Sequence, residues 1–260
     1  MTEPLKVLDC FSGIGGFALA ESFFEEQFET KQFVEINPYC QQVLSKNFKG
    51  VPIHDDIKTF TAPRGSFDIA TFGFPCQDIS IGGQQKGIGE GTRSGLFYEC
   101  IRLLREIRPQ FAIFENVRNL LSIEEGKVFQ EVLFQIAQAG YDAEWSVVSA
   151  RDVGGSHLRE RVWIIAYPNH KRLEGLRGEH ELQESCGEEK ARWRTQPYTL
   201  RPDWQRYDSQ PCIPRRNDGL PKKLDPNWRN RKERIQCLGN AVTPQQAAIP
   251  LGRIIDLIKS

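Results

Sequence analysis

The stretch from Lys6 to Ala18, KVLDCFSGIGGFA, decides the fold. A short apolar run, Lys6–Cys10, leads directly into a glycine-rich loop, and the loop opens a helical segment. Glycines at such a place permit a tight turn and let a ligand approach the backbone over the helix N-terminus. A strand, a glycine loop and a helix in this order are typical of the first unit of an α/β domain.

A carboxylate follows at the spacing that a nucleoside site requires. Glu35 ends the next expected strand, 20 residues after Gly15, where a carboxylate can accept hydrogen bonds from both ribose hydroxyls of an adenosine. The loop also fits G-x-G-x-x-A, so these residues alone leave a nicotinamide cofactor and S-adenosylmethionine both open. A glycine turn that only packs a helix on a strand is the structural alternative. Asp56 and Ile57, near the end of a third strand, are candidates to meet the adenine amino group.

Beyond this unit, short apolar runs alternate with helix-period segments up to about residue 166, which predicts a mostly parallel sheet with helices on both faces. The composition then shifts to Pro, Arg and Glu, and helical periodicity returns near the end, with an interruption expected at Pro250. We therefore expect one α/β domain formed by residues 1–166 and 235–260, with a small irregular insertion at 167–234. The expected strands are Lys6–Cys10, Gln32–Glu35, Phe67–Phe72, Gln110–Phe114, Glu144–Ser149 and Arg161–Ala166, and the terminal helix is Gln245–Ile258.

Composition excludes several classes of protein. With 39% hydrophobic and 26% charged residues in 260, the chain is typical of a globular protein. No apolar run approaches the ~18 residues of a membrane span, and the N-terminus lacks the layout of a signal peptide. Seven cysteines without CxxC pairs argue against a disulfide framework and a cysteine zinc site. We expect a soluble, cytoplasmic protein with no metal.

The net charge of zero conceals a local excess. Between Lys190 and Arg234, thirteen Lys/Arg face five Asp/Glu, an excess of +8, and three tryptophans and two tyrosines are interspersed among them. Basic residues interleaved with aromatics favour a nucleic-acid surface. A solvated segment with a few anchoring tryptophans is the alternative.

Further chemistry-bearing residues follow the expected strands, where open α/β sheets bind their ligands. Pro75 and Cys76 come after the strand that ends at Phe72, and a thiolate there can serve as a nucleophile. Glu115 ends the next strand, and burial beside Cys76 would hold its proton as acid catalysis requires. Arg159 and Arg161 precede the last strand, and alternation places both on one face. A buried hydrophobic thiol, a capping carboxylate and a surface basic pair are the structural alternatives.

Together these residues resemble the cytosine-5 DNA methyltransferases. Any one motif is weak, but eight in the family's order over nearly the whole chain are specific. The resemblance covers residues 5–166 and 235–258, and is poor between them. The matching elements are Phe11-Ser12-Gly13-Ile14-Gly15-Gly16-Phe17, Glu35, Asp56-Ile57, Pro75-Cys76-Gln77, Arg93-Ser94-Gly95-Leu96-Phe97, Glu115-Asn116-Val117, Arg159-x-Arg161 and Gly239-Asn240-Ala241-Val242-Thr243-Pro244.

The resemblance implies a Rossmann-like, S-adenosylmethionine-dependent methyltransferase fold and a covalent mechanism. Cys76 is similar to the nucleophile that adds to carbon 6 of a flipped-out cytosine, which activates carbon 5 for methylation. Glu115 is similar to the residue that contacts ring nitrogen 3, Arg161 to the one at the base carbonyl, and Arg159 to the one that supports the nucleophile loop. The implied cofactor-binding residues are Phe11, Gly13, Gly15, Gly16, Glu35, Asp56, Ile57, Pro75 and Asn240.

The resemblance also implies duplex DNA as the partner, with residues 167–234 as a short target-recognition region. Gln77, Arg93, Arg215 and Arg216 are the expected DNA contacts. We expect a monomer, associated with the nucleoid if the protein is bacterial, and a cognate restriction endonuclease is a candidate partner. Two features depart from the family pattern: His157 replaces a usual glutamine, and an Arg-Leu-Thr element is not evident.

Three other functions are compatible with parts of the sequence. A tRNA cytosine-5 methyltransferase built on the same scaffold would carry the same Cys76, Glu115 and arginine elements. A non-catalytic nucleic-acid-binding protein would not need them intact. A Rossmann dehydrogenase would leave Cys76 and Glu115-Asn116 unexplained.

Overall fold

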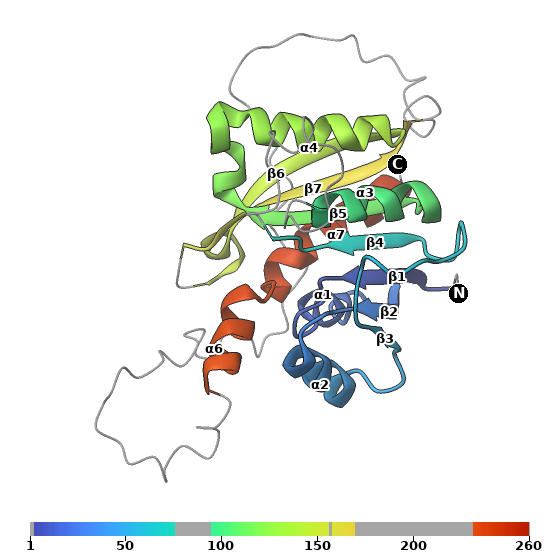
Figure 1. The fold of residues 1–260 in the computed structure, drawn as a ribbon, viewed down its shortest axis with the longest axis vertical. Helices are drawn as coiled ribbons and strands as arrows, with labels where there is room; N and C mark the ends of the chain where they lie inside the picture. The colour runs from blue at the N-terminus through green and yellow to red at the C-terminus, as the bar shows by residue number, and fades with distance from the viewer. Residues whose placement is uncertain (1–2, 76–94, 156–157, 170–230, 260) are drawn as a thin grey trace.

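A single seven-stranded sheet organises the chain (Figure 1). The computed structural model describes residues 3–75, 95–155, 158–169 and 231–259. Across these residues the strand order is β3-β2-β1-β4-β5-β7-β6. The strands from β3 to β5 pair in parallel, whereas β7 is antiparallel to both β5 and β6. The strands are β1 Leu5–Cys10, β2 Phe28–Val34, β3 Ile53–His54, β4 Ile69–Phe72, β5 Phe111–Val117, β6 Tyr141–Ser149 and β7 Glu160–Pro168.

Helices cover both faces of the sheet, as the sequence predicts, because successive strand residues point to opposite faces. Leu8 of β1 belongs to the core beneath α3 and α4, whereas its neighbour Val7 belongs to the core shared with α1 and α7. A smaller core beneath α2 contains Phe33 of β2. The helices are α1 Gly16–Glu21, α2 Pro38–Asn47, α3 Leu96–Ile107, α4 Lys127–Gln138, α6 Arg231–Asn240 and α7 Pro244–Lys259, with short 3-10 turns η4 Arg118–Leu121, η5 Ile123–Gly126 and η6 Ala150–Val153 (Figure 1).

The predicted mostly parallel α/β sheet is confirmed, and the differences are local. Strand β5 continues to Val117, so Glu115 lies inside it and not after its end. Strand β2 starts at Phe28 and ends at Val34, so Glu35 is the first residue beyond it. Both shifts keep the carboxylates near the carboxyl ends of their strands.

The terminal helix α7 continues through Pro250, where the sequence predicts an interruption. Proline inside a helix costs about 3 kcal/mol, because a hydrogen bond is lost and the ring crowds the preceding turn. Here the apolar face is buried on both sides of the proline, at Ala247 and Leu251 as well as Ile254. This burial against the sheet and α1 offsets the local cost.

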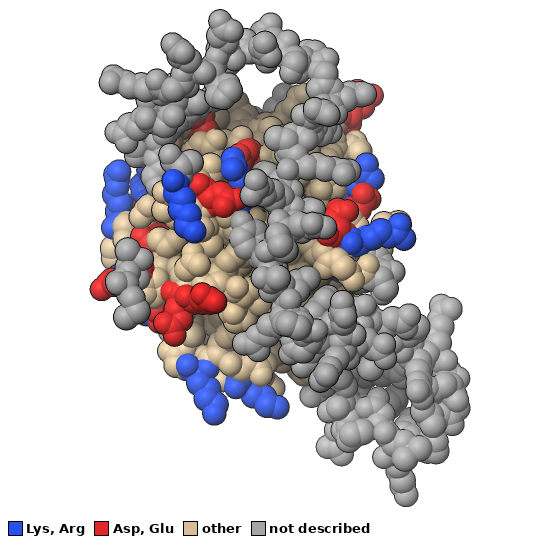
Figure 2. Space-filling view, turned by 180° about the vertical axis from the view of Figure 1, so that it is seen from behind, with Lys and Arg blue, Asp and Glu red and all other residues tan. Residues whose placement is uncertain are grey.

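Surface charges of both signs are interspersed over the described residues (Figure 2). On the face seen there, blue and red side chains alternate, and no continuous basic surface forms among the coloured residues. No helix of the described residues is long and apolar enough to cross a membrane. By sequence, most of the positive excess between Lys190 and Arg234 belongs to residues 190–230, which lie outside the described ranges.

A buried carboxylate joins α1 to β2. Glu21, the last residue of α1, is 7% exposed. Its Oε2 accepts from the Thr30 amide at 2.9 Å, and its Oε1 accepts from the Thr30 hydroxyl at 2.6 Å. Burial raises the pKa of Glu21 from its ordinary 4.5 to about 7, although both bonds from Thr30 oppose the shift. The folded protein thus keeps a proton that the unfolded chain releases near pH 4.5.

We predict that Glu21 makes the protein less stable as the pH rises. Its contribution is greatest below pH 4.5 and is lost as the pH rises through about 7, because the folded state binds the extra proton. Between pH 5 and 8, Glu21→Gln should reduce the fall in the free energy of unfolding by roughly 2–3 kcal/mol. Urea unfolding at both pH values measures this difference. The exposed Glu26→Gln serves as the control, and equal pH dependence in the wild type and Glu21→Gln would refute the assignment.

Candidate active site

The glycine loop after β1 is held in a strained but well-bonded conformation. Phe11 has φ 58°, a left-handed value that is uncommon for a residue with a side chain. Its amide donates to the Val34 carbonyl at 2.8 Å, and the Ser12 hydroxyl donates to the Asp9 carbonyl at 2.6 Å. These bonds join the loop to the ends of β1 and β2.

The three glycines of this loop face different surroundings. A β-carbon on Gly13 would meet nothing within 4 Å, whereas one on Gly15 would lie 2.3 Å from the Phe48 ring and one on Gly16 2.4 Å from the Val242 carbonyl oxygen. Packing therefore requires glycine at positions 15 and 16. At Gly13 the space is open, which suits the close approach of a ligand to the backbone.

Glu35 points back to the glycine loop. Its Oε2 accepts from the Gly13 amide at 2.7 Å, and its Oε1 accepts from the Asn37 amide at 2.7 Å. The side chain is buried, and burial raises the pKa of Glu35 against the opposing effect of these amides. One carboxylate thus fixes both the loop after β1 and the start of α2.

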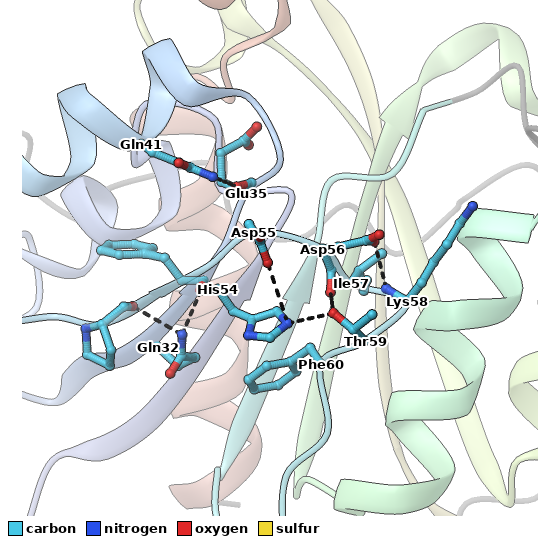
Figure 3. Close-up of polar contacts among 12 residues, drawn as sticks. Gln32, Glu35, Gln41, His54, Asp55, Asp56, Ile57, Lys58, Thr59 and Phe60 are labelled. Carbon is cyan, nitrogen blue, oxygen red and sulfur yellow. Dashed lines mark hydrogen bonds and ion pairs between the residues drawn. The ribbon is translucent and has the colours of Figure 1, made fainter.

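The segment after β3 runs beside Glu35 (Figure 3). The Glu35 amide donates to the His54 carbonyl at 2.9 Å, which places Asp55 and Asp56 next to the end of β2. The Asp56 carboxylate accepts from the Lys58 amide at 2.9 Å and so closes a turn. Arg102 of α3 donates to the Ile57 carbonyl at 2.8 Å and so joins this turn to α3.

The segment after β4 leads toward the expected nucleophile. Gly73, Phe74 and Pro75 follow the strand, and Pro75 is exposed while Phe74 is buried. The Asn116 amide group donates to the Phe74 carbonyl at 3.0 Å inside the protein. A β-carbon on Gly73 would lie 3.8 Å from Glu115 Oε2. The chain therefore passes close to Glu115 just before Cys76.

A buried ion pair occupies the centre of the site. Arg161 Nε lies 2.9 Å from Glu115 Oε1, and both side chains are largely buried, at 17% and 11% exposed. Burial raises the pKa of Glu115, and the positive charges of Arg161 and Arg159 oppose it without cancelling it. The Arg161 guanidinium thus orients the carboxyl group of Glu115, and the pKa of this group stays above its ordinary value.

Arg159 connects this centre to the end of the chain. Its guanidinium donates from Nη1 to the Gly239 carbonyl at 3.0 Å and from Nη2 to the Ala241 carbonyl at 2.7 Å. Burial, and then the like charge of Arg161, lower the pKa of Arg159. Asn240, which lies between the two bonded residues, is exposed.

The structure brings most of the predicted residues to the side of the sheet where the parallel strands have their carboxyl ends. Phe11, Gly13, Glu35, Asp56 and Ile57 lie on the β1–β3 side, and Pro75, Glu115, Arg159 and Arg161 on the β4–β7 side. Cys76, Gln77, Arg93, His157, Arg215 and Arg216 lie outside the described residues.

Two residues of the site were placed by the sequence only within longer motifs and received no role of their own. Asn116 supports the segment before Cys76, and Val242 fits between Gly16 and Gly73. Asn116 had a signal in its place beside Glu115. Val242 had none beyond its motif, because its role arises from contact between distant segments.

The family of the chain follows from its similarity to known proteins. Residues 5–236 match the family of C-5 cytosine-specific DNA methylases. The chain belongs to this family. The cofactor of the family is S-adenosyl-L-methionine.

Individual relatives match about two thirds of the chain. It is 37% identical over 169 residues to the type II methyltransferase M.NlaX of Neisseria lactamica, covering 64% of this chain and 53% of that one. It is 33% identical over 173 residues to M.HhaI of Haemophilus parahaemolyticus, covering 66% and 52%. The S. pombe Dnmt2 methyltransferase shares the fold, with a TM-score of 0.53 at 19% identity, covering 73% of this chain and 62% of that one. The chain spans about half the length of the curated relatives it matches.

The residues on the β1–β3 side fit the family's cofactor. Gly13 leaves open space above the loop, and the buried Glu35 carboxylate presents acceptors at the end of β2. Both suit a nucleoside with ribose hydroxyls to donate.

We predict that Glu35→Ala weakens the binding of S-adenosylmethionine by roughly 1.5–3 kcal/mol, the range for hydrogen bonds to a charged group. The loss has two causes, since the ribose acceptors and the Gly13 anchor disappear together. Titration calorimetry measures the change, with the exposed Glu29→Ala as the control. Unchanged affinity in Glu35→Ala would show that the carboxylate only shapes the loop.

Proposed function

We propose that this chain transfers a methyl group from S-adenosylmethionine to carbon 5 of a cytosine flipped out of duplex DNA. The observation that carries the proposal is the buried Glu115–Arg161 pair at the carboxyl ends of the sheet, beside the segment that leads to Cys76. A carboxyl group whose pKa is raised by burial, next to a fixed guanidinium, suits the recognition and protonation of a base edge.

The proposed chemistry begins at the cytosine ring. The Cys76 thiolate adds to carbon 6, while Glu115 donates a proton to ring nitrogen 3 and Arg161 contacts the base carbonyl. Carbon 5 then becomes nucleophilic, as covalent catalysis requires. The cofactor, when bound, supplies an electrophilic methyl group on a sulfonium. After methylation, water accepts the carbon 5 proton, the carbon 6–sulfur bond breaks with its electron pair on sulfur, and ring nitrogen 3 returns its proton to Glu115. These steps restore the ring, the thiolate and the acid.

The remaining residues receive roles in keeping with their positions. Phe11, Gly13, Glu35, Asp56, Ile57, Pro75 and Asn240 would hold the cofactor, while Gly15 and Gly16 shape the loop. We further propose that residues 1–166 and 235–260 form the catalytic domain and 167–234 the target-recognition region. The protein would act as a monomer, with a restriction endonuclease as its candidate genetic partner.

We predict that Cys76→Ala abolishes methyl transfer and leaves cofactor affinity within about 2-fold of wild type, since the thiol acts on the base. Transfer of labelled methyl groups to mixed-sequence duplex DNA measures the first effect, and calorimetry the second. Duplex containing 5-fluorocytosine should trap a covalent adduct with wild type only, because fluorine cannot leave as a proton.

Cys100→Ala, which removes a buried thiol of α3, is the matched control and should retain the adduct. Normal turnover by Cys76→Ala would end the covalent proposal. Methylation of tRNA and not of duplex DNA by wild type would redirect the substrate while keeping the chemistry.

We predict that DNA affinity depends on the basic stretch from Lys190 to Arg234. Each neutralised phosphate contributes about −0.9 to the log–log salt slope, and we expect roughly four to six such contacts. The double variant Arg215→Ala/Arg216→Ala should weaken binding and reduce the slope by up to about 2.

Arg64→Ala/Arg105→Ala is the charge-matched control for this double variant. Both arginines are exposed and lie near the opposite edge of the sheet, where the Gly65 amide donates to the Ile107 carbonyl at 2.7 Å. If the two double variants give the same salt series, the basic stretch does not contact DNA.

A further inference from the structure

Gln246 of α7 is a buried polar side chain with two backbone partners. It is 0% exposed. Its Nε2 donates to the Val148 carbonyl at 2.8 Å and to the Arg159 carbonyl at 2.7 Å. These two carbonyls stand at the start and the end of the connection between β6 and β7. One amide group therefore joins both sides of that connection to α7.

An amide at this position has a cost that its two bonds must offset. Gln246 Oε1 is buried and has no hydrogen-bond partner among the described residues. An unsatisfied buried acceptor costs about 1–3 kcal/mol. An apolar side chain would avoid this cost, and the neighbouring residues Ala247, Ile249 and Leu251 of α7 are buried apolar residues. The presence of glutamine is explained by the two carbonyls.

One of the two carbonyls that Gln246 bonds is that of Arg159, whose side chain connects the site to the 239–241 segment. The side chain of Arg159 reaches Gly239 and Ala241, and its charge acts on Glu115. The Arg159 carbonyl also accepts from the Ala150 amide at 3.1 Å. A side-chain bond from Gln246 of α7 and a backbone bond from Ala150 of η6 thus fix the backbone from which the Arg159 guanidinium reaches the 239–241 segment.

We infer that Gln246 is a positioning residue for methyl transfer, which acts by fixing the backbone of Arg159. The inference rests on the proposed function for its catalytic consequence. Its structural part, the hold on Arg159, does not depend on that function. Gln245 is the matched comparison for Gln246. It is 5% exposed in the same turn, and its Oε1 also has no partner among the described residues. The two bonds to the Val148 and Arg159 carbonyls come from Gln246.

The test compares Gln246→Met with Gln245→Met, since methionine keeps the length of glutamine and removes its amide. Hydrogen–deuterium exchange should be at least about 3-fold faster in peptides covering 147–161 and 238–243 of Gln246→Met, because local opening becomes easier. Gln245→Met should exchange like wild type. Should Gln246→Met fail to fold, Gln246→Asn keeps an amide that is one methylene too short and is expected to behave in the same way.

Activity measurements separate positioning from a general loss of stability. Gln246→Met should lower kcat by about 10–100-fold, the effect of a small misplacement of a catalytic group. The double variant with Arg159→Met should be within about 2-fold of Arg159→Met alone, because both changes act through one guanidinium. Arg159 holds down the pKa of Glu115, so the alkaline limb of the kcat profile should move to higher pH in Gln246→Met.

The outcomes are distinct. Faster exchange confined to Gln246→Met, together with non-additive kcat effects and the shifted pH profile, supports the inference. Equal exchange in the two glutamine variants, or additive kcat effects with an unchanged pH profile, overturns it. If the wild type transfers no methyl group to any nucleic acid, the proposed function fails, and the exchange data alone decide whether Gln246 holds Arg159.

Discussion

The close approach of Gly16 to the Val242 carbonyl is the contact on which the site depends. A β-carbon at position 16 would lie 2.4 Å from that oxygen, which is too close for any other residue without a shift of backbone. Residues at the two ends of the chain meet there. The contact lets α7 pack beside α1 in the core on one face of the sheet. The glycine loop therefore has a packing role in addition to its proposed role in cofactor binding.

Three buried glutamates are a second feature of this framework. Glu21, Glu35 and Glu115 are all buried, and burial raises the pKa of each. The groups that contact each carboxylate differ, and these groups determine what each carboxylate does in the structure. Glu21 and Glu35 accept hydrogen bonds from backbone amides and organise the first βα units, whereas Glu115 faces guanidinium groups and is the proposed proton donor. The surroundings of each glutamate thus distinguish a structural role, at Glu21, from the proposed catalytic role at Glu115.

Sequence reasoning located the parts that depend on local pattern. Strands buried on both faces, such as β4 and β5, are continuous apolar runs and were predicted within a few residues. The start of β2 was missed because Glu29 and Lys31 alternate with buried residues, and β3 has only two residues. Glu35 and Glu115 were expected near strand ends because each comes at the end of an apolar run, and ligands of open α/β sheets bind at such ends. The contributions of Val242 and Gln246 could not be predicted, because they arise where distant segments meet.

The two arginines near Glu115 illustrate how one residue type serves two tasks. Arg161 lies 2.9 Å from the carboxylate and orients it, so its charge is matched by a charge. Arg159 bonds two carbonyls that are two residues apart, a geometry that suits the planar fork of a guanidinium and not a single ammonium. Its charge is left to act on Glu115 through space. Lysine at position 159 would keep that charge but hold only one carbonyl well, so the electrostatic and the mechanical role of this position are separable by a single substitution.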